Sequence, residues 1–337
     1  MAALFAQTEE FIGRPLQHVP TSVEASPDTA SADRLQVLAD HGVRRISLGV
    51  QSFLSAETGR FGRPQNARNV LAALERIRRA AFSVLNIDLM YGGSTQTRES
   101  WLHSLRAALQ FQPEELYLYP LYVRPETGLA GVGREREAHR TDLYRAAVDL
   151  LGEQGYEQAS LRCFRLPAVA ESATLTASSD YACQRDGIIG LGCGARSYTQ
   201  SLHYSNRFAV SQAGVRAIVR SWIAQSDVEL GLATHGIRLN DEERQRRFVI
   251  LSLLQAIGLT VAEFKGRFPA GDLNRFTGLA ELAERGWLVR RPDRIVLTPI
   301  GLQNSDVVGP LLYSESVRRR LAEFVQLQPV RRTAEHA

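Results

Sequence analysis

The sequence predicts an α/β fold, namely a partial α/β barrel followed by a small C-terminal α+β domain. Segments with the two-residue period of strands alternate with segments of helical period through the first 165 residues. Short turns rich in glycine and proline join them, as in parallel sheets whose strands are connected by helices. After Asn240 the pattern changes to amphipathic helices and a hairpin, which indicates a second domain. We expect a partial barrel over 1–165, a connecting and barrel-closing segment over 166–239, and a winged-helix-like domain over 240–330.

The first part opens on a helical pattern over 2–12, which Gly13 ends. Strands are then predicted at 19–25, 45–50, 84–91, 116–121 and 159–164, with helices at 33–41, 67–80, 98–109 and 141–154. Polar side chains mark the ends of the first four strands: Glu24, Gln51, Asp88 and Tyr122. Because the carboxyl ends of barrel strands meet at one face, where barrels bind ligands, this pattern predicts a site there.

The second part has its own start signal. Asn240 followed by three acids is a helix N-cap, and a second helix is expected at 278–285, before a hairpin at 287–297. The preceding run GLGCGA at 190–195 formally fits a dinucleotide-binding fingerprint, but no helical period follows it, so we expect a structural turn. Asp180, Asp186 and His203 could form an acid–base group, although no short spacing forces them together.

The composition of the chain limits the classes of protein to which it can belong. The apolar fraction of 44% and charged fraction of 23% over 337 residues are those of a globular chain. No long apolar window or signal-peptide core is present, so we expect a cytoplasmic protein with no membrane partner. The net charge of +4 comes from scattered arginines, which argues against a nucleic-acid partner. Three cysteines with long gaps, Cys163, Cys183 and Cys193, fit a reducing compartment.

Four motifs in order carry a family resemblance. They read SVEASP at 22–27, GVRRISLGVQSF at 42–53, FGRP at 61–64 and NIDLMYG at 86–92. Together they resemble the barrel motifs of radical S-adenosylmethionine (SAM) proteins of the oxygen-independent coproporphyrinogen III oxidase type, including heme chaperone-like relatives. The segment 186–195 and the module after Asn240 resemble that family's closing segment and C-terminal domain. GGSTQT at 92–97 replaces the family's G-L-P-x-Q-T and indicates a divergent subgroup.

The resemblance implies a SAM site. Glu24 and Gln51 would face the amino or ribose groups of SAM, Arg63 its carboxylate and Asp88 a hydroxyl, with Tyr122 at the same strand ends. These pairings suit the chemistry, since a carboxylate accepts from hydroxyls and a guanidinium binds a carboxylate. Each residue alone is more often a strand-end group that satisfies the local backbone. The set together favours a cofactor site.

The family also implies a 4Fe-4S cluster held by a C-x3-C-x2-C motif. This sequence lacks the motif, so we expect no metal ligands in this chain and no radical chemistry by the chain as given. The family's first two strands are expected to precede residue 1, which makes the chain N-terminally incomplete and marginal in stability.

The leading interpretation is a radical SAM enzyme. In the complete family member SAM is cleaved reductively to a 5'-deoxyadenosyl radical, which abstracts hydrogen from a small-molecule substrate. A tetrapyrrole is one candidate substrate, and flavodoxin or ferredoxin would supply the electron. The alternatives are a non-catalytic heme-binding chaperone and a nucleic-acid-binding winged helix. Against the last, segment 278–285 carries Glu281 and Glu284 beside only Arg285, a poor surface for phosphates.

Overall fold

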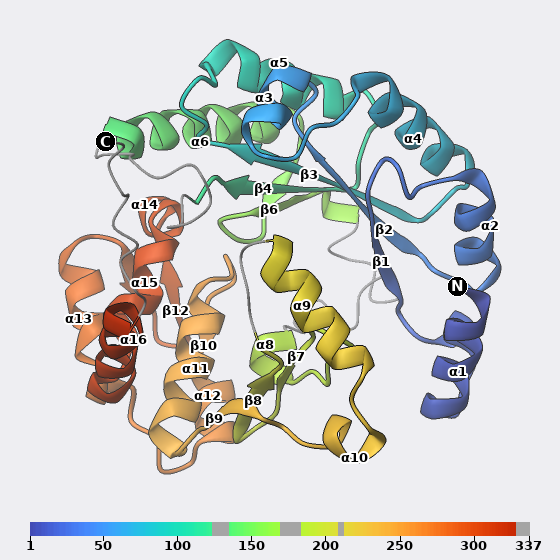
Figure 1. The fold of residues 1–337 in the computed structure, drawn as a ribbon. Helices are drawn as coiled ribbons and strands as arrows, with labels where there is room; N and C mark the ends of the chain where they lie inside the picture. Colours follow the sequence, from blue (N-terminus) through green and yellow to red (C-terminus); the bar gives the residue numbers. More distant parts are fainter. Residues whose placement is uncertain (123–134, 169–182, 208–211, 328–337) are drawn as a thin grey trace, which may run out of the picture. The chain divides into compact units, whose positions relative to one another are not determined.

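The computed structural model describes residues 1–122, 135–168, 183–207 and 212–327 (Figure 1). The chain divides into two compact units. Unit 1 contains Met1–Tyr181 and Phe208–Ser221, and unit 2 contains Ala182–Arg207 and Trp222–Ala337. Residues 182–207 thus group with the C-terminal module, whereas the predicted three-part division stays a prediction.

Unit 1 is built on a six-stranded sheet with the order β1-β2-β3-β4-β6-β5. Its strands are β1 (Ser22–Ala25), β2 (Arg45–Gln51), β3 (Val84–Tyr91), β4 (Glu115–Pro120), β5 (Glu157–Gln158) and β6 (Cys163–Arg165). The first four pair in parallel, with Glu24 beside Ser47, Ser47 beside Asn86 and Asn86 beside Glu115. The predicted series of parallel strands is therefore confirmed for β1 to β4.

Helices connect these strands. They are α1 (Ala2–Ile12), η1 (Leu16–His18), α2 (Ala32–Asp40), α3 (Ser55–Arg60), α4 (Ala67–Arg79), α5 (Arg98–Leu109) and α6 (Glu135–Glu153). The predicted ends of most helices lie close to the observed ones. Gly13 ends α1, as predicted, and adopts the left-handed conformation. The predicted helix at 141–154 begins earlier, at Glu135. Helix α9 (Gln212–Ile223) has residues in both units.

The end of the sheet differs from the expected strand at 159–164. The chain instead makes a short hairpin, in which β6 runs antiparallel to both β4 and β5. The return turn is fixed by the Leu118 N–H, which donates to the Arg162 carbonyl at 2.8 Å. Tyr156 also donates from its hydroxyl to the Pro113 carbonyl. Arg162 and Cys163 are thereby placed beside β4.

The core of unit 1 lies between the sheet and helices α2, α4, α5 and α6, which Figure 1 shows along one side of the strands. Strand residues on that side, such as Leu48, Ile87 and Leu118, are fully buried. Trp101 on α5 is also fully buried, and its indole N–H donates to the Leu143 carbonyl on α6 at 2.9 Å. Apolar burial therefore fixes which face of each strand the helices cover.

Unit 2 contains two three-stranded sheets, with the orders β7-β8-β9 and β10-β12-β11. Its strands are β7 (Arg196–Tyr198), β8 (Leu202–Ser205), β9 (His235–Arg238), β10 (Leu259–Thr260), β11 (Leu288–Arg290) and β12 (Arg294–Leu297). Its helices are α8 (Cys183–Asp186), α10 (Asp227–Leu230), α11 (Asp241–Leu253), α12 (Val261–Arg267), η2 (Leu273–Arg275), α13 (Thr277–Glu284), α14 (Pro299–Gln303), α15 (Ser305–Leu312) and α16 (Glu315–Leu327).

The predicted helix cap at Asn240 is present in the structure, whereas the start of the domain at that residue stays a prediction. The Asn240 side-chain oxygen accepts from the Glu243 N–H at 2.9 Å and so caps α11. The helix expected at 278–285 and the hairpin expected at 287–297 correspond to α13 and to β11–β12. The order α11, β10, α12, α13, β11, β12 is that expected of a winged helix, an assignment that stays a prediction. None of the helices in the described ranges combines the length and apolar character needed to cross a bilayer.

Replacing Leu48 by alanine tests how far the buried face of the sheet supports unit 1. Leu48 is 0% exposed, so Leu48→Ala should lower the free energy of unfolding by about 2–5 kcal/mol through lost burial and a cavity. Leu71→Ala on α4 is the matched control, because Leu71 is 40% exposed and should cost less than about 1 kcal/mol. Urea unfolding followed by circular dichroism measures both, and equal losses would contradict this account of the core.

Candidate functional site

The face of the sheet opposite the buried one carries polar side chains. We call it the polar face. It is defined by residues that alternate with fully buried ones along β2 to β4, and with half-buried ones along β1: Glu24, Ser47, Gly49, Asn86, Asp88, Tyr117 and Tyr119. Side chains two apart on a strand share a face, and paired positions on neighbouring strands lie side by side. The parallel register therefore gathers residues from four separate segments of the chain.

Asp88 lies at the centre of the polar face. Its two carboxylate oxygens accept from the Asn86 side-chain N–H at 2.7 Å and from the Ser47 hydroxyl at 3.3 Å. Burial raises the pKa of Asp88 above its usual range, and the charge of Glu24 adds to this rise. The bonds from Asn86 and Ser47 and the charge of Arg45 oppose it. Burial and Glu24 thus disfavour the ionised form of Asp88, whereas Asn86, Ser47 and Arg45 stabilise it.

Gln51 ends β2 in a special conformation. Its φ of 68° is left-handed, and the register between β2 and β3 shifts between Gly49 and Gln51. This bend turns the Gln51 side chain back toward Gly49, so that its amide nitrogen lies 3.0 Å from where a Cβ on residue 49 would be. Gln65 donates from its side chain to the Gly49 carbonyl at 2.9 Å. The Gln51 amide therefore lies over Gly49, where any larger residue would crowd it.

The aromatic residues of β4 extend the polar face toward Tyr122. The Arg162 guanidinium lies 5.8 Å from the Tyr119 ring centre and 5.6 Å from that of Tyr122. Arg162 also donates to the Tyr122 hydroxyl at 2.9 Å. Burial, with the charges of Asp88 and Glu24, raises the pKa of Tyr119 to about 12, so this phenol stays protonated at neutral pH. Tyr122 is linked to the polar face through Arg162, which the sequence did not suggest.

Arg63 stands apart from the other predicted site residues. It is exposed in the loop after α3, where its backbone N–H donates to the Thr58 carbonyl at 2.9 Å. Within the described residues, no hydrogen bond or ion pair joins its side chain to Glu24, Gln51 or Asp88. The role predicted for Arg63 stays a prediction, as do the roles of the other four residues.

Sequence reasoning missed a buried carboxylate at the strand ends. Glu57 on α3 accepts from the Ser52 hydroxyl at 2.7 Å, the Ser100 hydroxyl at 2.6 Å and the Gln96 side chain at 3.1 Å. Gln96 also accepts from the Gly92 N–H at 2.9 Å. The network fixes the loops after β2 and β3, which carry the motifs GVQSF and GGSTQT. The polar residues within those two motifs were the sequence signal that could have indicated this network.

The three cysteines, Cys163, Cys183 and Cys193, are all free thiols. Burial raises the pKa of the Cys163 thiol to about 12, which keeps it protonated beside Tyr117. Cys183 and Cys193 are free thiols of unit 2. Across the described ranges, no three His, Cys, Asp or Glu side chains are grouped as metal ligands.

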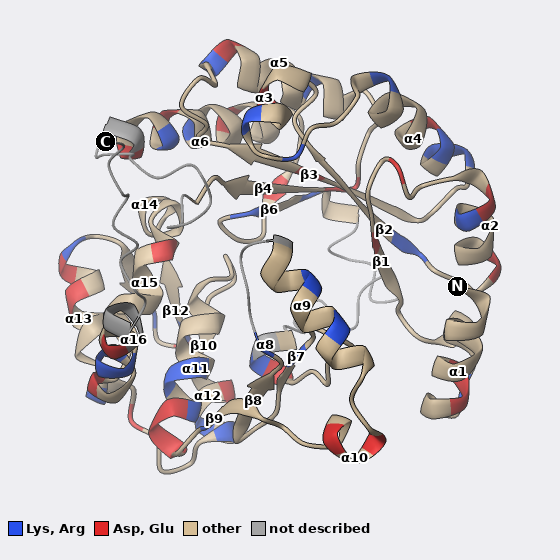
Figure 2. Ribbon diagram, in the orientation of Figure 1, with Lys and Arg blue, Asp and Glu red and all other residues tan. Residues whose placement is uncertain are grey.

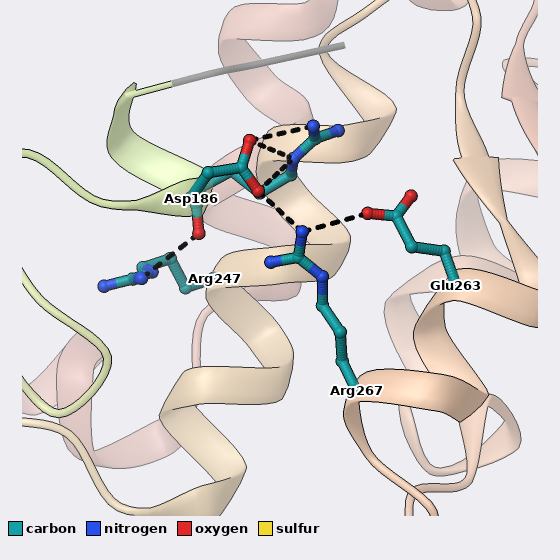
Figure 3. A network of polar contacts seen from close by, with 5 residues as sticks. Asp186, Arg247, Glu263 and Arg267 are labelled. Carbon is teal, nitrogen blue, oxygen red and sulfur yellow. Dashed lines mark hydrogen bonds and ion pairs between the residues drawn. The ribbon is translucent and has the colours of Figure 1, made fainter. Parts of the chain in front are cut away.

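A second polar cluster lies within unit 2, where Figure 3 shows Asp186 between arginines. Asp186 binds Arg185 on its own helix and Arg267 at 2.8 Å, and Arg267 also binds Glu263 at 3.1 Å. Arg247 donates to the Arg185 carbonyl at 3.3 Å.

His203 also contacts Arg247, whose guanidinium donates to the imidazole Nε2 at 2.6 Å. Burial and the charge of Arg247 lower the pKa of His203 to about 4, so the imidazole is neutral at pH 7. Asp186 and His203 are each engaged with arginines, which fits a structural role for both. Asp180, the third member of the imagined acid–base group, lies outside the described residues.

Charges of both signs are interspersed over the helices, as Figure 2 shows. On α13, Glu281 is paired with Arg285. This is the mixed surface that the sequence predicted for the segment 278–285, and it gives no concentrated basic stripe there.

Comparison with known proteins places these features in a family. Residues 5–108, which include Glu24, Gln51, Arg63 and Asp88, match the Radical SAM superfamily. The chain is 26% identical over 299 residues to the heme chaperone HemW of Bacillus subtilis (strain 168), covering 86% of this chain and 75% of that protein. It is 25% identical over 304 residues to the oxygen-independent coproporphyrinogen III oxidase of Escherichia coli (strain K12), covering 83% of this chain and 64% of that protein.

Structural comparison agrees on the fold. The solved structure of coproporphyrinogen III oxidase (HemN) from Escherichia coli, described as a radical SAM enzyme, superposes with a TM-score of 0.71 at 21% identity. The match covers 93% of this chain and 74% of that one, which confirms the predicted α/β fold class. The chain therefore carries a radical SAM domain and is homologous to the heme chaperone HemW and to oxygen-independent coproporphyrinogen III oxidase.

Proposed function

We propose that unit 1 binds SAM on the polar face, at the carboxyl ends of β1 to β4. The observation that carries this proposal is the Asp88 carboxylate on β3, which pairs in register with Gly49, the residue over which the Gln51 amide is folded. A half-buried carboxylate with a raised pKa, subject to the like charge of Glu24, is costly for folding. Such groups concentrate at binding sites, where a ligand compensates the cost.

The donor and acceptor set fits the ligand. Glu24 and Asp88 can accept from ribose hydroxyls or from an ammonium group, and the Gln51 amide can both donate and accept. Tyr122 offers an aromatic face beside Arg162. Arg63, exposed after α3, is the guanidinium that we assign to the SAM carboxylate. In this proposal the five predicted residues keep their roles as cofactor-binding residues.

The substrate proposed for the site is a tetrapyrrole, because the two named relatives are a heme chaperone and a coproporphyrinogen oxidase. In a complete radical SAM enzyme the cluster supplies the electron that cleaves SAM, and flavodoxin or ferredoxin would be its source in the cytoplasm. The described residues do not fit a 4Fe-4S cluster, so we derive no step through it. The function proposed for the chain as given is SAM binding without SAM cleavage.

A second candidate function is heme binding without catalysis. The observation that favours it is the similarity to HemW, which extends over 86% of this chain. A nucleic-acid-binding role has less support, because α13 pairs Glu281 with Arg285 rather than presenting free cations.

Substitution at the polar face should weaken SAM binding. We expect Asp88→Asn and Gln51→Ala each to lower SAM affinity about tenfold or more, which corresponds to about 1.4 kcal/mol for a lost hydrogen bond to the ligand. Isothermal titration calorimetry of the purified chain measures this. Asp142→Asn is the control, since Asp142 forms an exposed ion pair with Arg98 and should leave the affinity unchanged. A wild-type chain with no SAM binding would contradict the proposal.

The same Asp88→Asn substitution should not harm the fold. Because the folded-state pKa of Asp88 is raised, the folded chain holds its proton to higher pH than the unfolded chain does. Stability contributed by this group is therefore lost as pH rises through about 4 and above. We expect Asp88→Asn to be as stable as the wild type at pH 4 and more stable than the wild type at pH 7. Thermal melts at both pH values test this, and a variant less stable only at pH 7 would refute it.

Reconstitution separates the catalytic from the chaperone interpretation. After anaerobic incubation with iron and sulfide, the chain should retain no stoichiometric iron, because the described residues contain no group of three side chains suited to bind a metal. Titration with heme, followed by the Soret absorbance, tests the second candidate function. Saturable heme binding that Asp88→Asn leaves unchanged would favour the chaperone role. A bound iron–sulfur cluster would show that Cys163, Cys183 or Cys193 acts as a ligand, contrary to our interpretation.

A further inference from the structure

We infer that Ser47 and Asn86 are positioning residues that fix the orientation of the Asp88 carboxylate on the polar face. The inference rests on the proposed SAM site, in which Asp88 contacts the ligand. It adds two residues that were not among the predicted binding residues and that act through Asp88.

The geometry is a closed triangle of side chains. The Asn86 amide nitrogen donates to the Ser47 hydroxyl at 2.6 Å and to Asp88 Oδ1 at 2.7 Å. The Ser47 hydroxyl then donates to Asp88 Oδ2 at 3.3 Å. Both carboxylate oxygens thus have a donor from within the sheet. A carboxylate with both oxygens held cannot rotate freely about its last bond, so its direction is set before a ligand arrives.

The choice of asparagine at position 86 is not explained by folding. Asn86 is 1% exposed, and its side-chain oxygen Oδ1 is buried without a hydrogen-bond partner in the described structure. A buried acceptor left without a partner costs about 1–3 kcal/mol. An apolar residue would avoid that cost in a strand whose neighbours Leu85 and Ile87 are fully buried. The Asn86 amide nitrogen offsets this cost by donating to the Ser47 hydroxyl and to the Asp88 carboxylate.

The orientation of the amide follows from the same contacts. Turning the Asn86 amide over would place its oxygen 2.7 Å from Asp88 Oδ1, where two acceptors repel each other. An ionised Asp88 therefore holds Asn86 in the observed orientation, and Asn86 in turn favours the ionised Asp88. Ser47, which is 3% exposed, completes the triangle from the neighbouring strand.

Several charged or titratable groups lie on the elements around Asp88, in addition to the hydrogen-bond donors Ser47 and Asn86. Those on the elements beside it are Glu24 on β1, Arg45 on β2, and Tyr117 and Tyr119 on β4. Burial and Glu24 favour the protonated acid, whereas Arg45 favours the carboxylate. Removing the Asn86 donor should therefore shift the balance toward the protonated acid, which can no longer accept through both oxygens.

The test follows the Asp88 carboxyl directly by 13C NMR of chain labelled at aspartate carboxyl carbons, without ligand. Asp88→Asn assigns the resonance. We expect Asn86→Ala to raise its titration midpoint by about one pH unit, since a hydrogen bond to a charged group contributes about 1.5–3 kcal/mol and one unit is about 1.4 kcal/mol. Ser47→Ala, which removes the longer bond, should raise it by about half a unit. Ser104→Ala is the control, because Ser104 is equally buried but bonds Ser52.

An unchanged midpoint in Asn86→Ala would overturn the inference. If Asn86→Ala does not fold, Ser47→Ala is the test, and an unchanged titration midpoint in Ser47→Ala would also overturn the inference. Calorimetry with SAM at pH 5 and pH 7 separates this inference from the proposed function. Two results together support both the positioning role and the SAM site: the titration midpoints shift in the variants, and the variants bind SAM more weakly than the wild type mainly at pH 5. Shifted midpoints in a chain that binds no SAM keep the positioning role and overturn the SAM site.

Discussion

The parallel pairing of β1 to β4 is the constraint on which the rest of unit 1 depends. Parallel neighbours require a crossing connection, and each connection here is helical. The helices bury one face of every strand, so the other face is left for polar groups. Because all four strands run in the same direction, their carboxyl ends meet, and the charges of Glu24 and Asp88 both act on the Tyr119 phenol, which lies far from Glu24 in the sequence.

A polar face built this way has a cost that the buried face must outweigh. Asp88 is partly buried beside the like charge of Glu24, and Asn86 leaves an acceptor without a partner. Apolar burial on the helical side supplies the compensating stability. In the loops after β2 and β3, by contrast, the buried carboxylate of Glu57 accepts hydrogen bonds from three donors. The Glu57 network is thus satisfied, whereas the proposed binding face retains a buried acceptor without a partner at Asn86.

Unit 2 uses buried polar groups for architecture. Arg247 binds carbonyl oxygens at Thr199 and Arg185 and the ring of His203, and so ties α11 to the sheet β7-β8-β9 within this unit. The glycine-rich segment before β7 is equally structural, because a Cβ at Gly190 would collide with the Arg196 backbone at 2.5 Å. This supports the prediction that the run at 190–195 is a turn rather than a nucleotide fingerprint.

The sequence by itself determined the order of elements, most of their ends, the Asn240 cap and the family motifs, because period and capping are local properties. It also named Glu24, Gln51 and Asp88 as strand-end groups. Only the tertiary structure decided that Ser47 and Asn86 hold Asp88, that Arg162 joins Tyr119 to Tyr122, and that β6 returns antiparallel. These contacts join different strands, and their existence depends on register, which no local pattern specifies.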